Sequence, residues 1–224
     1  MILQPQQHCQ PLITQPNSHN YNQQNPPAML RASQFHHPAP RPLMSAPIVY
    51  PAQETRRVIG IIGDSHLNGV SPGQMANRIG GNPQVLKFSY SGATTPHLLC
   101  YSDVLLASKP SDVVIHVGCN DIWGRNCRNT NSQEIANDII LLAKKCRSHG
   151  VQRIYISSLF ITKVSSSNQQ QAEINELLKS LCSSNGFRYI DNSYVTQADL
   201  GDEVHLKHSS RINFYNKIAD SFNY

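Results

Sequence analysis

Short apolar runs alternate along this chain with longer stretches in which apolar residues recur every three or four positions. The short runs are rich in Val and Ile, which is typical of strands buried on both faces of a sheet. Strands are expected at Val58–Ile62, Val85–Tyr90, Val113–Val117, Arg153–Ser158 and Arg188–Ile190. Helices are expected at Asn68–Ile79, Thr95–Ser108, Ser132–His149, Gln169–Ser183 and Arg211–Phe222.

Strands that alternate with helices of this length predict βαβ units and a parallel sheet. Because crossover connections are right-handed, few topologies remain. We therefore predict a three-layer α/β/α sandwich around a five-stranded, mostly parallel sheet, with a flavodoxin-like strand order. The clearest helix is Ser132–His149, where Ser132 is expected to be the N-cap.

The first 53 residues differ in composition from the rest of the chain, because they are rich in Gln, Asn, Pro, His and Ser. Such a composition cannot bury enough apolar surface to offset the entropy lost on folding. Residues 1–53 are therefore predicted to be a disordered tail, followed by one folded domain at 54–224.

Charge changes this picture little. The 224 residues carry a formal net charge of +5, and residues 1–50 hold two arginines and no acidic residue. The remainder therefore carries +3, a mild excess that does not predict a dedicated nucleic-acid-binding surface.

Several sequence features bear on location. No apolar run is long enough to cross a bilayer, and the first residues lack the basic start and apolar core of a secretion signal. The six cysteines show neither CxxC pairs nor zinc-ligand spacing. We expect free thiols in a reducing compartment, and hence an intracellular, cytoplasmic protein.

The first candidate catalytic segment is Gly63-Asp64-Ser65, which comes directly after the first predicted strand. A serine at the carboxyl end of such a strand has its hydroxyl at the mouth of a crevice, where ligands of open α/β sheets bind. This position suits a nucleophile. Taken alone, however, the stretch slightly favours another interpretation, in which Asp64 and Ser65 cap the next helix.

Three other polar segments also lie at the ends of predicted elements. Ser91-Gly92 follows the second predicted strand, Gly118-Cys119-Asn120-Asp121 follows the third, and Asp202-Glu203-Val204-His205 precedes the last helix. In a parallel sheet these loops open on one edge, so residues far apart in sequence are expected to meet there.

These loops contain what acyl transfer needs. His205 is a candidate base for the Ser65 hydroxyl, and Asp202 a candidate acid that fixes the His205 tautomer. The backbone N–H groups of Ser65 and Gly92 and the side-chain amide of Asn120 are candidate donors to an oxyanion.

Together the four segments resemble the SGNH hydrolase superfamily, the GDSL-type esterases and lipases, over residues 57–222. The resemblance implies the predicted sandwich fold and the same assignments: a triad of Ser65, Asp202 and His205, and an oxyanion hole of Ser65, Gly92 and Asn120. It implies no metal and no organic cofactor. The sequence departs from the family at His66, where leucine is frequent.

Three further residues are candidates for lining the substrate crevice: Asp64, His66 and Trp123. Each has a structural alternative. Asp64 is also suited to ordering the turn, His66 to being an exposed residue, and Trp123 to packing. Because the domain is compact and its loops are short, we expect the substrate to be a small ester or an acetylated compound.

A second resemblance concerns the layout of a polar leader followed by a small esterase domain. It is similar to the esterase-bearing first open reading frame protein of some non-LTR retrotransposons. This leaves an alternative function, a catalytically weak or inactive module that binds RNA or a protein partner. The sequence leaves the oligomeric state open.

Overall fold

The computed structural model describes residues 56–223. The predicted disordered tail and the boundary at residue 54 lie outside this range. The sheet contains β1 (Val58–Gly63), β2 (Gln84–Ser89), β3 (Asp112–His116), β4 (Arg153–Ser157) and β5 (Arg188–Ile190). Their order is β2-β1-β3-β4-β5, and every neighbouring pair is parallel. This confirms the predicted five-stranded sheet and its flavodoxin-like order.

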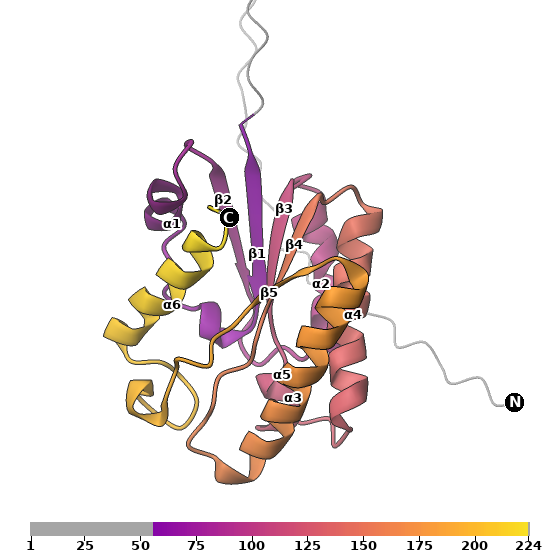
Figure 1. Cartoon of the computed structure of the whole chain (residues 1–224), viewed down its shortest axis with the longest axis vertical. Coiled ribbons are helices and arrows are strands. Elements are labelled where there is room, and N and C mark those ends of the chain that lie inside the picture. Colours follow the sequence, from indigo (N-terminus) through magenta and orange to yellow (C-terminus); the bar gives the residue numbers. More distant parts are fainter. Residues whose placement is uncertain (1–55, 224) are drawn as a thin grey trace, which may run out of the picture. The chain divides into compact units, whose positions relative to one another are not determined.

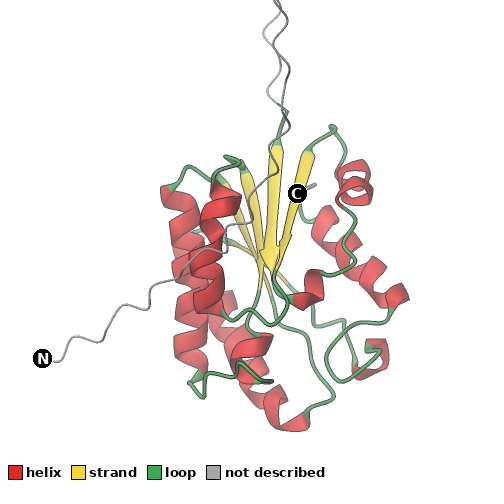
Figure 2. Cartoon of the chain, turned by 180° about the vertical axis from the view of Figure 1, so that it is seen from behind, coloured by secondary structure: helices red, strands yellow, loops and turns green. Residues whose placement is uncertain are grey.

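Helices cover both faces of the sheet (Figure 1). The helices are α1 (Pro72–Ile79), α2 (Thr95–Leu106), α3 (Cys119–Ile122), α4 (Ser132–Ser148), α5 (Ser165–Asn185) and α6 (His208–Asp220). Two short 3₁₀ turns, η1 (Ser65–Leu67) and η2 (Gln197–Asp199), complete the elements. Helices α1 and α6 pack on one face, and α2, α4 and α5 on the other, as Figure 2 also shows from behind. The three-layer sandwich is thus confirmed.

The central strands are buried on both faces, as their apolar runs predict. All of β3 is buried, and β1 from Ile59 onward. One core contains Ile62, Ile115 and side chains from α2, α4 and α5, and the other contains Ile61, Val114 and side chains from α1 and α6. Burial of this kind contributes about 25 cal/mol per Å² of apolar surface.

Some element boundaries differ from those predicted. The N-cap of α4 is Asn131, whose side chain accepts a hydrogen bond from the Glu134 N–H, and not Ser132. The Ser132 hydroxyl instead donates to Glu173 on α5. Helix α5 begins at Ser165, four residues earlier than predicted. Its first turn is held by Asn168, whose side chain bonds both backbone groups of Thr162.

Within residues 56–223, no helix is long and apolar enough to span a membrane.

Candidate active site

The serine turn, which we define as Gly63–Leu67, begins at the last residue of β1. Gly63 is required there, because a Cβ atom would lie 2.2 Å from the backbone oxygen of His116 on the adjacent strand. Asp64 then accepts a hydrogen bond from the His66 N–H through its side chain, and η1 begins at Ser65. The turn therefore has both features of the sequence expectation: a capping aspartate, and a half-buried serine at the sheet edge.

Ser65, His205 and Asp202 lie in one chain of contacts. Ser65 Oγ lies 2.9 Å from His205 Nε2, although the two residues are 140 positions apart. His205 Nδ1 lies 2.9 Å from Asp202 Oδ2. The side chains of His205 and Asp202 are 36% and 60% exposed, so this pair is open to solvent. The sequence predicted these three residues, and the structure brings them into hydrogen-bond contact.

The carboxylate of Asp202 is held ionised. Partial burial acts to raise its pKa, but hydrogen bonds from the N–H groups of His205 and Val204, and from the His205 ring, outweigh this effect. The pKa falls to about 2 as a result. Asp202 is therefore a carboxylate at any pH near neutrality, which favours a proton on Nδ1 of His205.

The second loop lies beside the serine turn. Gly92 has a φ of +75°, a conformation that favours glycine, and its carbonyl accepts a hydrogen bond from Asn126. Ser89, at the end of β2, donates a hydrogen bond to the carbonyl of Asp64. The structure thus ties the end of β2 to the turn that carries Ser65.

Asn120 lies in α3, a short helix that the sequence did not predict. Its amide Nδ2 donates one hydrogen bond to the carbonyl of Ala93, 3.0 Å away, which links the third loop to the second. An amide nitrogen carries two N–H groups, so one remains for another acceptor. Gly118, the N-cap of α3, has a φ of +131° that other residues rarely adopt.

Asp121, the next residue, has a positioning role that sequence reasoning did not assign. It is buried, and its carboxylate accepts hydrogen bonds from the N–H and hydroxyl of Thr95 at the start of α2. Arg128 donates to the same carboxylate. Burial raises the pKa of Asp121 more than these bonds lower it. The Asn-Asp pair in the motif was the available signal for this anchor.

The sequence predicts that Asp64 and His66 line the substrate crevice, whereas the structure buries both side chains. These side chains are 1% and 4% exposed and lie behind the serine turn. The reason is the short 3₁₀ turn, whose His66 and Leu67 are both buried. Trp123, at the end of α3, is half-buried. Its predicted place in the substrate wall stays a prediction.

The two buried residues form an ion pair. His66 Nδ1 lies 3.1 Å from Asp64 Oδ1, and His66 Nε2 lies 3.1 Å from the carbonyl oxygen of Val204. Burial disfavours both charges, but the pairing outweighs it, so the pKa of Asp64 is lowered and that of His66 is raised. His116, also buried, has a pKa lowered to about 3, by burial and then by the charge of His66.

One group within residues 56–223 has donor atoms close enough together to consider for a metal ion. It comprises Asp64, His66 and His116, whose donor atoms lie within 4.8 Å of one another. His66 Nε2 is bonded to the carbonyl of Val204 and His116 Nδ1 to the Ser157 hydroxyl. Asp64 Oδ2, His66 Nδ1 and His116 Nε2 are buried without a hydrogen-bond partner among the described residues.

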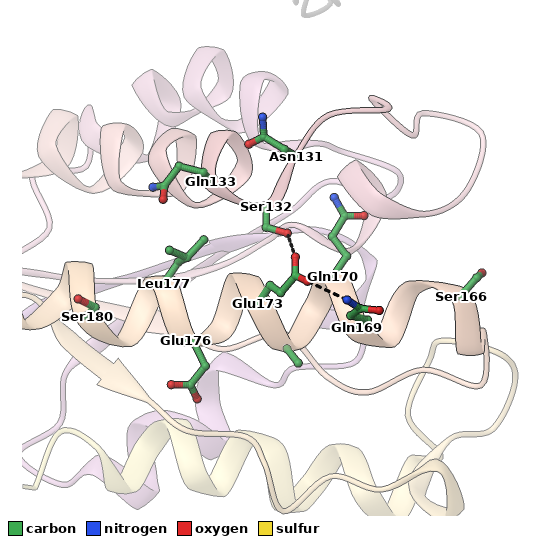
Figure 3. Close-up of a pocket in the computed structure, with 11 residues that line it drawn as sticks. Asn131, Ser132, Gln133, Ser166, Gln169, Gln170, Glu173, Glu176, Leu177 and Ser180 are labelled. Carbon is green, nitrogen blue, oxygen red and sulfur yellow. Dashed lines mark hydrogen bonds between the residues drawn. The ribbon is translucent and has the colours of Figure 1, made fainter.

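Two hollows are large enough to consider for a substrate. One, of about 450 Å³, adjoins Gly92 and is lined by Ser89, Tyr90, Ser91, Ala93, His97, Tyr101 and Asn126 as well. A larger one, of about 1100 Å³, lies on α5 and the start of α4, where Glu173 bonds Ser132 and Gln169 (Figure 3). None of its lining residues belongs to the four loops, whereas the hollow beside Gly92 is lined in part by residues of the second loop.

With the geometry established, the chain can be compared with known proteins. The family model of the GDSL-like Lipase/Acylhydrolase family matches residues 61–210, more than half of the chain. The chain belongs to this family. The match includes Ser65, Gly92, Asn120, Asp202 and His205 and confirms the resemblance seen in the sequence. No curated protein sequence matches the chain.

Solved structures share its fold at low sequence identity. A carbohydrate acetylesterase from Sinorhizobium meliloti has a TM-score of 0.62 and 20% identity, covering 75% of this chain and 99% of its own. A GDSL-like lipase from Bacteroides thetaiotaomicron has a TM-score of 0.63 and 15% identity, and the match covers 77% of this chain and 90% of the lipase. An acetyl-xylooligosaccharide esterase from Geobacillus has a TM-score of 0.64 and 14% identity, and the match covers 75% of this chain and 94% of the esterase. At these identities the likeness concerns the fold of the family.

Proposed function

We propose that this member of the family is a serine esterase that cleaves short-chain carboxylic esters or acetyl groups through an acyl-enzyme. The observation that carries this proposal is the chain of contacts from Ser65 Oγ to His205 Nε2 and from His205 Nδ1 to Asp202 Oδ2, each 2.9 Å long. A serine hydroxyl becomes a useful nucleophile only when a base takes its proton.

In the first half-reaction, Ser65 Oγ attacks the ester carbonyl while His205 Nε2 takes the hydroxyl proton. The C–O bond to the alcohol then breaks, and His205 returns the proton to the departing oxygen. In the second half, water attacks the acyl-serine with His205 again as base. This releases the acid and restores Ser65. Asp202 stabilises the imidazolium that forms in each half.

The negative charge on the carbonyl oxygen needs donors. We assign this role to the N–H groups of Ser65 and Gly92 and to the free amide N–H of Asn120. Support comes from the bond between Asn120 and the carbonyl of Ala93, which holds the amide next to Gly92.

The nature of the hollow beside Gly92 supports a short and polar substrate. Most of its lining residues are polar, and Tyr90 and Tyr101 form an aromatic pair with ring centres 4.7 Å apart. A long acyl chain needs a continuous apolar wall to repay its desolvation. The acetylesterases among the similar structures fit this expectation.

The experiment is hydrolysis of p-nitrophenyl acetate, butyrate and octanoate. We expect kcat/KM to be about tenfold higher for acetate than for octanoate. The variant Ser65→Ala should lose at least about 10³-fold, and Ser184→Ala, an exposed serine on α5, should keep wild-type activity. No turnover by the folded wild type, or equal turnover by Ser65→Ala, would refute the proposal.

The alternative of an inactive module that binds RNA or a protein is not favoured, because the side chains needed for catalysis are bonded to one another. RNA binding and the resemblance to retrotransposon proteins stay predictions from the sequence.

A further inference from the structure

A second carboxylate–histidine pair lies behind the nucleophile, and the mechanism above does not use it. Asp64 and His66 flank Ser65 in sequence, and their side chains are almost completely buried. The His66 ring packs against His116 and Phe160, with centres 5.4 Å and 5.0 Å away. A buried ionisable pair is costly to maintain, so its contacts deserve an explanation.

The partners of His66 fix its protonation. A carbonyl oxygen can only accept a hydrogen bond, so Nε2, 3.1 Å from the Val204 oxygen, must carry a proton. On the other side of the ring, Nδ1 faces Asp64 Oδ1 at 3.1 Å. That oxygen also accepts the His66 backbone N–H, which favours an ionised carboxylate. Together these contacts favour an imidazolium, with a proton on each ring nitrogen.

The acceptor of His66 is significant because of what the same peptide group does on its other side. The carbonyl of Val204 and the N–H of His205 belong to one peptide unit. The carbonyl accepts from His66, while the N–H donates to Asp202 Oδ1 at 2.6 Å. This peptide is therefore held on both sides, by the buried pair and by the acid of the triad.

We propose that His66 is a positioning residue that fixes the peptide between Val204 and His205, and through it aims the His205 ring at Ser65. This inference rests on the proposed function of Ser65 and His205. It explains why a histidine directly follows the nucleophile. One turn then presents the serine hydroxyl outward and, on its buried side, the side chain that holds the peptide next to the base. We call this contact of His66 with the Val204–His205 peptide the clamp.

The surroundings favour such a clamp. Phe160 and Phe214 pack on the neighbouring His116, and the Phe160 ring also contacts His66, so water does not surround the pair. In an environment of low polarity, hydrogen bonds between charged groups and a carbonyl are stronger than in water. A displacement of about 1 Å at a reacting atom can cost about 10²-fold in rate, so even a modest loosening of this peptide should be measurable.

The kinetic test compares His66→Phe with His66→Gln in the wild-type background. Phe keeps a ring but removes the donor, and we expect kcat for p-nitrophenyl acetate to fall by up to about 100-fold while KM changes little. Gln keeps an N–H donor at its end, so it should recover part of the loss. His149→Gln, an exposed histidine at the end of α4, is the matched control and should match wild type.

A second measurement does not depend on turnover. Nitrogen-15 NMR of the histidine rings should show an imidazolium signal with both nitrogens protonated at neutral pH that vanishes in His66→Gln. Metal analysis of the same sample tests the rival occupant, an ion held by Asp64, His66 and His116. A stoichiometric bound metal would overturn the clamp.

The outcomes separate the two proposals. If the wild type hydrolyses no ester, the proposed function fails, and the NMR signal still decides whether the buried imidazolium exists. If the wild type is active and folded His66→Phe has the same kcat, the positioning role is wrong although the esterase assignment stands. If Gln restores nothing and both variants melt far below wild type, His66 serves stability alone, which also contradicts the proposal.

Discussion

Two aspartate–histidine pairs lie on either side of one peptide group, and they differ in almost everything except composition. Asp202 and His205 are 2.9 Å apart and solvent-exposed, whereas Asp64 and His66 are 3.1 Å apart and almost completely buried. In the exposed pair, Nε2 of the histidine faces the Ser65 hydroxyl. In the buried pair, Nε2 is bonded to the carbonyl of Val204.

The difference shows how the third partner determines what such a pair can do. A hydroxyl can give up its proton, so a histidine that faces one is able to act as a base. A carbonyl has no proton to give, so a histidine that faces one can only hold it in place. Chemically identical pairs are therefore suited to proton transfer at His205 and to positioning at His66.

The largest effect should come from His205→Ala. The change removes the base that faces Ser65, and we expect kcat/KM to fall by about 10⁴- to 10⁶-fold. Because the ring is partly exposed, the melting temperature should change little. Steady-state kinetics and thermal denaturation check both points. Activity retained within tenfold would mean that the exposed pair is not the base.

The second largest effect should come from Asp202→Asn, for which we expect kcat to fall by up to about 10⁴-fold. The amide carries no charge to stabilise the imidazolium, and its NH₂ group can donate to Nδ1, which favours the tautomer with the proton on Nε2. That tautomer cannot take the proton of Ser65. Since hydrogen bonds lower the pKa of Asp202 to about 2, protonation of this carboxylate should contribute no acid limb to the wild-type kcat/KM profile well above pH 2. A limb that disappears in Asp202→Asn while activity persists would contradict this.

Asn120→Ala tests the other requirement of the exposed pair, a place for the charge that attack creates. Removal of one oxyanion donor should reduce kcat by about 10²- to 10³-fold with little change in KM. The matched control is Asn129→Ala, an exposed asparagine in the loop before α4. A loss confined to KM would show that Asn120 binds substrate and does not stabilise the transition state.

The smallest effect concerns stability. Pairing raises the pKa of His66 above its ordinary 6.5 and lowers that of Asp64 below 3.8. The stability from His66 is therefore complete below pH 6.5 and lost as pH rises through its folded value, and that from Asp64 is lost at low pH. The free energy of unfolding of the wild type should exceed that of His66→Gln by about 1–3 kcal/mol near pH 5. This difference should become smaller as the pH rises above neutrality.

The pH dependence of this difference has to be read with the other groups near His66. His116 stays neutral in the fold, which opposes stability below pH 6.5, while Asp202 and His205 lie across the clamped peptide. Asp202→Asn, which lacks the exposed charge but keeps the buried pair, is the control. Urea titrations from pH 5 to pH 9 measure the difference, and an advantage for wild type that grows with pH contradicts the ion pair.

Most of the fold could be predicted from the sequence, because the strands that lie in the centre of the sheet are continuous apolar runs. The predicted end of β1 at Ile62 is one residue short, since Gly63 still pairs with Ser89 and His116. The short helix α3 could not be predicted, because its four residues show no periodicity. Caps depend on single hydrogen bonds, which is why Asn131 could not be distinguished from Ser132.

The site divides in the same way. Ser65 and His205 stand in motifs at strand or loop ends, so their contact follows from the topology of a parallel sheet, as does the contact of Asn120 with the second loop. The burial of His66 could not be predicted, because it depends on the inward path of η1 and on a backbone carbonyl 138 positions away. No side-chain pattern reports a backbone acceptor, so the second pair was visible only in three dimensions.

The most direct test of the central claim is labelling with a fluorophosphonate probe, which reacts only with an activated serine. We expect rapid, stoichiometric labelling of the wild type at Ser65, mapped by peptide mass spectrometry. Ser65→Ala should not react, His205→Ala should react far more slowly, and His66→Phe should react at an intermediate rate. Labelling of folded wild type at another residue, or none at all, would contradict the account.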